Sequence, residues 1–96
     1  MHLEVITPDK TLFKGNAEAV SFPGSDGSFQ VLKGHAPIIS SLKDGKIKID
    51  LQDDVSNYDE IYTDIEKDSS NKRVILLAIK GGVVEMQNDR IIVLAD

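Results

Sequence analysis

Cysteine and tryptophan are both absent from this chain of 96 residues, and so is any long apolar run. Without cysteine, neither a disulfide framework nor a thiolate metal site can form. A helix needs an apolar run of about 18 residues to cross a membrane, so we expect no direct membrane insertion. Residues 1–4 are neither basic nor continuously apolar, so we expect no signal peptide.

Positive charge is also scarce, since the formal net charge is −5. Residues 1–48 carry six Lys against five acidic residues, whereas residues 49–96 carry five Lys or Arg against eleven acidic residues. Neutralising phosphates requires clustered Lys and Arg. The composition therefore argues against nucleic acid as a partner, and against direct binding to anionic lipid.

The chain does have many short apolar stretches separated by turn residues. The clearest alternation covers 46–51, where Ile47, Ile49 and Leu51 are expected to face inward. One exposed face is typical of an antiparallel sheet. The sequence therefore predicts an all-β fold, a small antiparallel β-sandwich or flattened barrel of about ten strands. We expect it to form one domain over residues 1–96.

Turn residues set the expected limits of the strands. We expect turns at Pro8-Asp9, Pro23-Gly24, Lys43-Asp44-Gly45 and Asn88-Asp89, and a turn or a bulge at Gly81-Gly82. The expected strands cover 3–7, 17–22, 28–32, 36–42, 46–51, 73–79, 83–87 and 90–94, with a short extended piece at 12–15. In 17–22 we expect Ala17, Ala19 and Ser21 on one side of the strand and Glu18, Val20 and Phe22 on the other. Core positions are predicted for Phe13, Phe22 and Phe29.

An acidic insertion at about 52–73 differs in character from the rest of the chain. Eight acidic residues lie between Asp50 and Asp68, against the single Lys67. Tyr58, Ile61, Tyr62 and Ile65 have helical spacing, but Tyr62 to Glu66 also fits an edge strand of an extra hairpin. Both alternatives remain open, and a mobile loop is the third. A turn is predicted at 68–71 in every case.

Catalytic chemistry has little support in the sequence. Ser28, His35 and Asp26 would supply the residue types of a Ser-His-Asp triad, yet no nucleophile-elbow pattern surrounds the serine. Any small domain offers such a triple by chance. We therefore expect no catalytic residues.

Metal and nucleotide sites have no better support. Asp64, Glu66 and Asp68 resemble the start of a calcium loop, but its sixth position is Ser69 instead of Gly and its twelfth is Ile75 instead of Glu. A solvated acidic loop is the simpler interpretation. The glycines match neither G-x-G-x-x-G nor the P-loop pattern, so we expect no cofactor.

Seven fragments, in order, carry a family resemblance over nearly the whole chain. They are Leu3-Glu4-Val5-Ile6-Thr7-Pro8, Leu12-Phe13-Lys14-Gly15, Phe22-Pro23-Gly24-Ser25-Asp26-Gly27, Gly34-His35-Ala36-Pro37, Leu42-Lys43-Asp44-Gly45, Gly81-Gly82-Val83-Val84-Glu85-Met86 and Val93-Leu94-Ala95-Asp96. Together they resemble the β-sandwich part of the small epsilon subunit of F-type ATP synthases.

The resemblance implies a non-catalytic central-stalk (rotor) subunit of a proton- or sodium-driven ATP synthase. Such a subunit links the gamma shaft to the c-ring and couples rotation to ATP synthesis. The implied partners are the gamma subunit and the c-ring, with one copy of the chain in each complex. The implied location is peripheral, on the cytoplasmic face of the bacterial inner (plasma) membrane. A free-standing β-sandwich adaptor that binds a protein or peptide by an exposed edge strand is the alternative.

Three departures from the family pattern are visible. Relatives usually continue past the segment 94–96 into two helices that inhibit ATP hydrolysis and in some members bind ATP. This sequence holds no such helical domain, so we expect neither property of it. The insertion at 52–73 is the second departure. Third, Ser28 stands where many relatives carry Glu, and Lys33 where many carry Pro.

The resemblance also indicates which residues would contact the ring. We predict a subunit interface made by Ser28, Phe29, Lys33, Gly34, His35, Ala36, Pro37 and Ser40. For His35 two roles stay open. It is either a turn residue hydrogen-bonded to the backbone or an exposed residue at a subunit contact.

Overall fold

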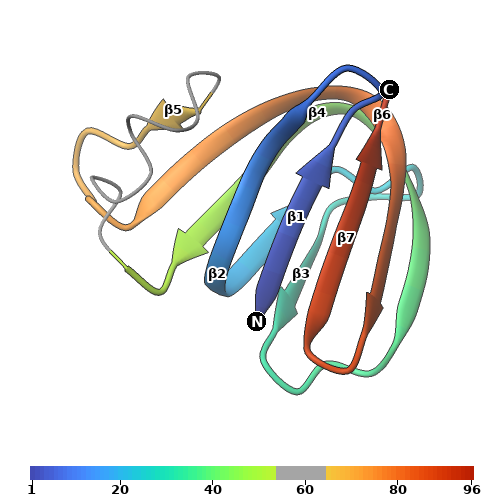
Figure 1. Cartoon of the computed structure of the whole chain (residues 1–96), viewed down its shortest axis with the longest axis horizontal. Helices are drawn as coiled ribbons and strands as arrows, with labels where there is room; N and C mark the ends of the chain where they lie inside the picture. The colour runs from blue at the N-terminus through green and yellow to red at the C-terminus, as the bar shows by residue number, and fades with distance from the viewer. Residues whose placement is uncertain (54–64) are drawn as a thin grey trace.

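The computed structural model describes residues 1–53 and 65–96. They form the strands β1 (His2–Ile6), β2 (Thr11–Phe22), β3 (Phe29–Leu32), β4 (Ile38–Leu51), β5 (Glu66–Lys67), β6 (Val74–Gln87) and β7 (Arg90–Ala95) (Figure 1). The described part of the chain contains no helix. The prediction of an all-β fold is confirmed.

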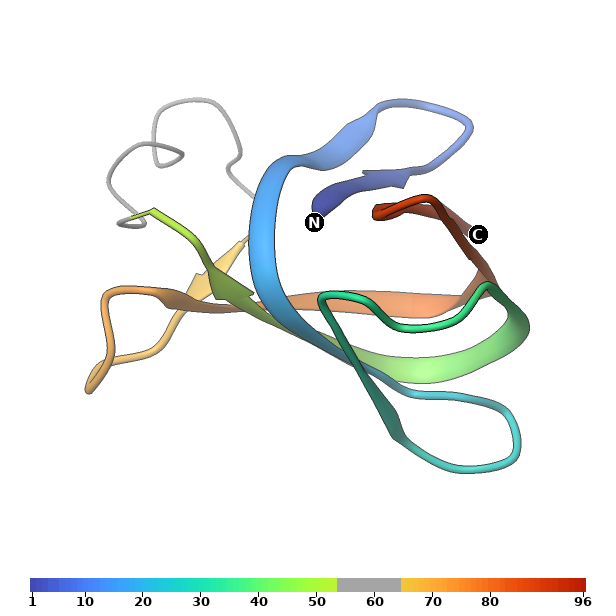
Figure 2. The ribbon, with the colours of Figure 1, turned by 90° about the horizontal axis from the view of Figure 1, so that it is seen from below.

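The sheet closes on itself. Its strand order is β1-β7-β6-β4-β2-β3, and an additional pairing of β1 with β2 completes a ring of β1, β7, β6, β4 and β2. Figure 2 shows the strands wrapped around this ring. β3 continues the edge of β2 beyond β1, and β5 pairs with β6 outside the ring. The prediction of a flattened barrel or sandwich is confirmed.

The strand count of about ten differs from the seven strands described because three strands are long and bent. β2, β4 and β6 each run through both layers of the sandwich, so the sequence suggests two strands where the structure has one. β4 and β6 stay in one unbroken register from the pair Ile38 and Met86 to the pair Asp50 and Val74. The turn predicted at 43–45 is therefore wrong. Residues 81–82 form neither the turn nor the bulge predicted there, because both glycines stay paired with β4 without a register shift.

Glycines lie at the bends of β4 and β6, where neighbouring segments come too close for a side chain. A Cβ on Gly45 would lie 2.8 Å from Cβ of Pro23, and Gly82 sits against the carbonyl oxygen of Leu94. Glycine permits this close approach of neighbouring segments, so it marks a bend within a strand as well as it marks a turn. By contrast, Asn88 and Asp89 form the predicted two-residue hairpin turn, with φ of 53° and 63°.

Two layers result from this bending. We call the β1–β7 layer the one that holds β1, β7, the segments of β2 and β6 paired with them, and residues 38–43 of β4, which pair with that segment of β6. The β3–β5 layer holds β3, β5 and the remaining segments. β1 runs parallel to β7, in register from His2 and Arg90 to Ile6 and Leu94 (Figure 1). The expectation of a purely antiparallel sheet is wrong at this pair, since the first and last strands meet through space and need no hairpin.

A bulge in β2 corrects the predicted alternation of 17–22. Ala17 pairs with Leu51 but Ala19 pairs with Asp50, so β2 has one extra residue at Glu18. Ala17 and Val20 are consequently both buried, although the sequence pattern placed them on opposite sides. The bulge shifts the inward side of the strand by one residue.

The core fills the space between the layers. Phe13 and Phe22 are fully buried, as predicted. Phe29 is half-buried and packs against the core, with its ring centroid 5.5 Å from that of Phe22. Among the described residues no buried polar or charged side chain interrupts this core.

Residues 65–73 form the second part of the predicted insertion. Glu66 of β5 pairs with Leu76 of β6, and its carboxylate accepts a hydrogen bond of 2.9 Å from Nζ of Lys46. The turn at 68–71 is confirmed. Asp68 Oδ1 accepts hydrogen bonds from the backbone N–H groups of Ser70 and Asn71 and from the Ser70 hydroxyl. The helical alternative rests on Tyr58, Ile61, Tyr62 and Ile65. All of these but Ile65 lie outside the described residues, as do residues 62–64 of the edge-strand alternative.

Candidate partner-binding surfaces

The eight residues of the predicted interface divide into three groups. Ser28 and Phe29 lie at one end of β3, residues 33–37 form the loop from β3 to β4, and Ser40 lies in β4. Ser28 and the whole loop are exposed, whereas Phe29 and Ser40 are half-buried. β3 itself separates the first group from the loop. The loop is the part of the predicted interface most available to a partner.

His35 is a turn residue hydrogen-bonded to the backbone, which is the first of the two roles considered for it. Its backbone N–H donates to the carbonyl of Leu32 at 3.0 Å, so it belongs to a turn. Its Nδ1 lies 2.7 Å from the carbonyl oxygen of Ala36 and acts as the donor, because a carbonyl oxygen only accepts. The side chain is exposed all the same. This hydrogen bond orients the ring and leaves Nε2 directed toward solvent or a partner.

The geometry does not assemble the triad considered above. Ser28 and His35 stand at opposite ends of β3, and Nδ1 of His35 is engaged by Ala36. Within the described ranges, no group of three or more His, Asp or Glu side chains is placed to hold a metal ion. Asp68, one member of the calcium-like pattern, directs an oxygen to its own turn. Hydrogen bonds from Ser70, and then from Asn71, hold the pKa of Asp68 below its usual value.

An exposed apolar surface, absent from the sequence-based prediction, covers the outside of the β1–β7 layer. We call it the apolar face and define it by Ile39, Val83, Ile92 and Leu94. Ile39 is 75% exposed and Leu94 is 59% exposed. Register brings them together: Ile39, Glu85 and Ile92 form one cross-strand row, and Ser41, Val83 and Leu94 form the next. Four large apolar side chains thus share one face.

The outer face of the β3–β5 layer is different. In the strand pairs there, Lys46, Lys48 and Asp50 of β4 point outward beside β6. Lys46 is further paired with Glu66. Among the described residues this face exposes a single large apolar side chain, Leu32 of β3, beside these charged side chains. Contiguous exposed apolar surface, by contrast, marks an interaction site. The contrast makes the apolar face the leading candidate for a partner contact.

Two hollows flank Glu85 on the apolar face. One has a volume of about 410 Å³ and is lined by Pro37, Ile38, Ile39, Glu85, Met86 and Gln87. The other, of about 190 Å³, is lined by Glu85, Gln87, Asn88, Arg90 and Ile92. Both are shallow and open, which suits side chains of a protein partner better than an enclosed small molecule.

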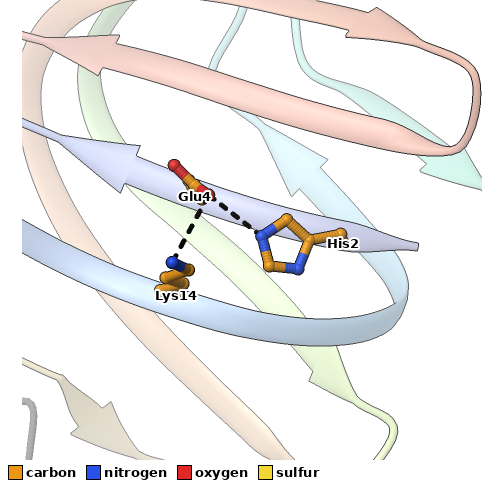
Figure 3. A network of polar contacts seen from close by, with 3 residues as sticks. All are labelled: His2, Glu4 and Lys14. Carbon is orange, nitrogen blue, oxygen red and sulfur yellow. Dashed lines mark hydrogen bonds and ion pairs between the residues drawn. The ribbon is translucent and has the colours of Figure 1, made fainter.

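A charged corner adjoins the apolar face at β1 (Figure 3). Glu4 Oε1 lies 3.0 Å from Nε2 of His2 and 4.0 Å from Nζ of Lys14. The hydrogen bond to His2, followed by the charge of Lys14, lowers the pKa of Glu4 below its usual value. Glu4 therefore has a hydrogen-bond partner and a nearby cation within this chain.

No helix in the described residues is long and apolar enough to cross a membrane.

Comparison with known proteins places the chain in a family. Residues 1–64 match the family model described as "ATP synthase, Delta/Epsilon chain, beta-sandwich domain". The ATP synthase epsilon chain of Chlorobium limicola is 39% identical over 74 residues, which cover 77% of this chain and 84% of that relative. The epsilon chain of Campylobacter jejuni is 38% identical over 95 residues, which cover 99% of this chain but 60% of the longer relative.

Solved structures agree on the fold. A chain of the Euglena gracilis mitochondrial ATP synthase, in a structure of its OSCP, F1 and c-ring, superimposes with a TM-score of 0.70 over 97% of this chain and 48% of its own length. A chain of the Tetrahymena thermophila mitochondrial ATP synthase central stalk and c-ring gives a TM-score of 0.64, covering 99% of this chain and 62% of its own length. The identities are only 17% and 15%, so these structures bear on the fold alone. The family model and the close bacterial relatives carry the assignment: this chain belongs to the ATP synthase delta/epsilon chain β-sandwich family.

Proposed function

We propose that this chain is a non-catalytic central-stalk subunit of an F-type ATP synthase, which joins the gamma shaft to the c-ring. The observation that carries the proposal is the apolar face on a closed barrel whose sequence belongs to the epsilon family. A permanent contact within a rotor needs a large, water-excluding interface, of about 2,000 Å² or more in total. The apolar face supplies a suitable centre for one.

Torque transmission requires a part that does not deform between its two contacts. The ring of five paired strands leaves the barrel closed, and its core holds no buried polar side chain within the described ranges. Close-packed interiors have low compressibility, so force applied on one side is passed to the other. The fold thus supports a mechanical role in which this chain makes and breaks no covalent bond.

Two separate surfaces contact the two partners in this proposal. The apolar face contacts the shaft, because a permanent protein contact favours apolar cover. The loop 33–37, with Ser28 and Ser40, contacts the polar loops of the ring. The exposed, polar character of Lys33 and His35 fits such loops. The chain acts as one copy per complex and needs no cofactor.

The proposed location follows from these partners. In a complex with a membrane-embedded ring, the chain is peripheral and lies on the cytoplasmic face of the bacterial plasma membrane. The Chlorobium and Campylobacter relatives support a bacterial setting. The coupling ion is a proton or sodium.

Cysteine crosslinking in the assembled complex tests the two contacts separately, since the chain has no cysteine of its own. We expect Leu94→Cys to crosslink to the shaft and His35→Cys to crosslink to the ring. Lys48→Cys, on the outer face of the β3–β5 layer, is the control and should crosslink to neither. Crosslinks of all three variants to a protein outside the ATP synthase would contradict the proposal and favour the adaptor alternative.

A further inference from the structure

Glu85 is the one acidic side chain between two residues of the apolar face. In register it lies opposite Ile39 of β4 on one side and Ile92 of β7 on the other. It also lines both hollows of this face, so it forms the ridge between them. Any partner that covers Ile39 and Ile92 must remove water from the carboxylate between them.

The cross-strand row of Glu85 contains a second carboxylate, which has different neighbours. Ile92 is paired with Glu4 of β1, so the order across the sheet is Glu85, Ile92, Glu4. Glu4 has His2 at 3.0 Å and Lys14 at 4.0 Å (Figure 3). Glu85 has no ion pair within 4.0 Å among residues 1–53 and 65–96. Within the described ranges the chain thus supplies partners to one carboxylate of the row and leaves the other exposed without an ion pair.

Burial of an unpaired carboxylate is costly, and burial of a paired one is acceptable only when its hydrogen bonds are satisfied. From this we propose that Glu85 receives a basic side chain of the partner that covers the apolar face. The partner segment then presents a Lys or Arg surrounded by apolar side chains that fill the two hollows. The inference rests on the proposed function, because the partner is the shaft subunit.

Arg90 offers a competing source of positive charge. It lines the smaller hollow together with Glu85, although no ion pair joins the two side chains in the structure. If Arg90 were to swing onto Glu85 during docking, no partner cation would be needed. Substitution of Arg90 distinguishes the two sources of charge. If Arg90 pairs with Glu85, binding needs both residues equally; if a partner cation pairs with Glu85, binding needs Glu85 but not Arg90.

Affinity measurements decide the matter. The soluble head of the host ATP synthase, with its shaft but stripped of this subunit, is titrated with the purified chain. Glu85→Gln keeps the shape and removes the charge, and we expect it to raise Kd about 30-fold or more. Glu18→Gln, at another exposed position, in β2 and away from the apolar face, is the matched control and should change Kd less than about 2-fold. We expect Arg90→Gln to stay within about 3-fold.

The failure of this inference can be told from the failure of the proposed function. Leu94→Ser tests the contact of the apolar face without touching the charge, and we expect it to raise Kd markedly. Weakened binding by Leu94→Ser with unchanged binding by Glu85→Gln overturns the inference alone. Equal losses for Glu85→Gln and Arg90→Gln overturn it in favour of the internal pair. Absence of binding by the unsubstituted chain, or self-association through this face instead, overturns both. Unchanged thermal melting of each variant shows that the losses are not due to unfolding.

Discussion

Gly82 of β6 lies directly against the carbonyl oxygen of Leu94 in β7, in the space that a Cβ would occupy. Its φ of 147° is also one that residues with a side chain rarely adopt. The bend of β6 from one layer to the other therefore depends on this glycine. We expect Gly82→Ala to lower the free energy of unfolding by about 1–3 kcal/mol or more, as measured by urea denaturation.

Gly27 provides a matched control for this substitution. Its φ is 131°, but a Cβ there would meet nothing within 4 Å. Gly27→Ala thus reports the backbone cost alone, and we expect a smaller loss than for Gly82→Ala. Equal losses would show that the contact with Leu94 contributes nothing.

The paired rings of Phe22 and Phe29 predict unequal costs of truncation. Phe22 is fully buried, so Phe22→Ala should cost about 3–5 kcal/mol of stability. Phe29 is half-buried, so Phe29→Ala should cost about 1–3 kcal/mol and leave a folded chain. Chemical denaturation of both variants checks the order. A larger loss for Phe29→Ala would contradict burial as the cause of the order, since both variants remove the same ring contact.

The corner at Glu4 predicts a dependence of stability on pH. Since the folded state lowers the pKa of Glu4, its stabilising contribution is present above the unfolded pKa, about 4.3, and is lost as pH falls through the lower folded pKa. Glu4→Gln should therefore destabilise the chain at pH 7 and lose this effect at acidic pH. Denaturation midpoints across this range, beside those of Glu18→Gln, provide the measurement. A difference from the parent chain that persists unchanged at low pH would contradict the role of His2 and Lys14.

The Asp68 turn predicts local consequences at β5. Asp68→Ala removes the acceptor of three hydrogen bonds from Ser70 and Asn71. We expect faster hydrogen exchange at those two amides and at β5, with the core strands unchanged. Asp68→Asn keeps an acceptor oxygen and should restore much of the protection. If exchange at Ser70 were equally slow in Asp68→Ala, the carboxylate would not organise the turn.

Strand type and the short turns could be predicted from the sequence, but the bends could not. Alternation over 46–51 correctly indicates which residues of β4 face inward, and Asn88-Asp89 correctly indicates a tight hairpin. Gly45 and Gly82 carry the same local signal as turn glycines. Only the position of Pro23 and Leu94 in space makes them bends of continuous strands.

The apolar face escaped the sequence analysis for a related reason. Ile39, Val83, Ile92 and Leu94 come from three strands, and only the register of β4, β6 and β7 brings them together. One signal was available. Residues 91–94 are all apolar, which indicates a strand with apolar side chains on both faces. In this barrel one face of that strand packs in the core and the other is exposed to solvent.

The most direct test of a central-stalk role is to pull down the tagged chain from its native membranes and to identify the bound proteins by mass spectrometry. We predict recovery of the gamma subunit and the c-ring, with loss of gamma from Leu94→Ser and loss of the ring contact from His35→Ala. Both variants should melt like the parent chain. Recovery of neither rotor subunit by the parent chain would contradict the account.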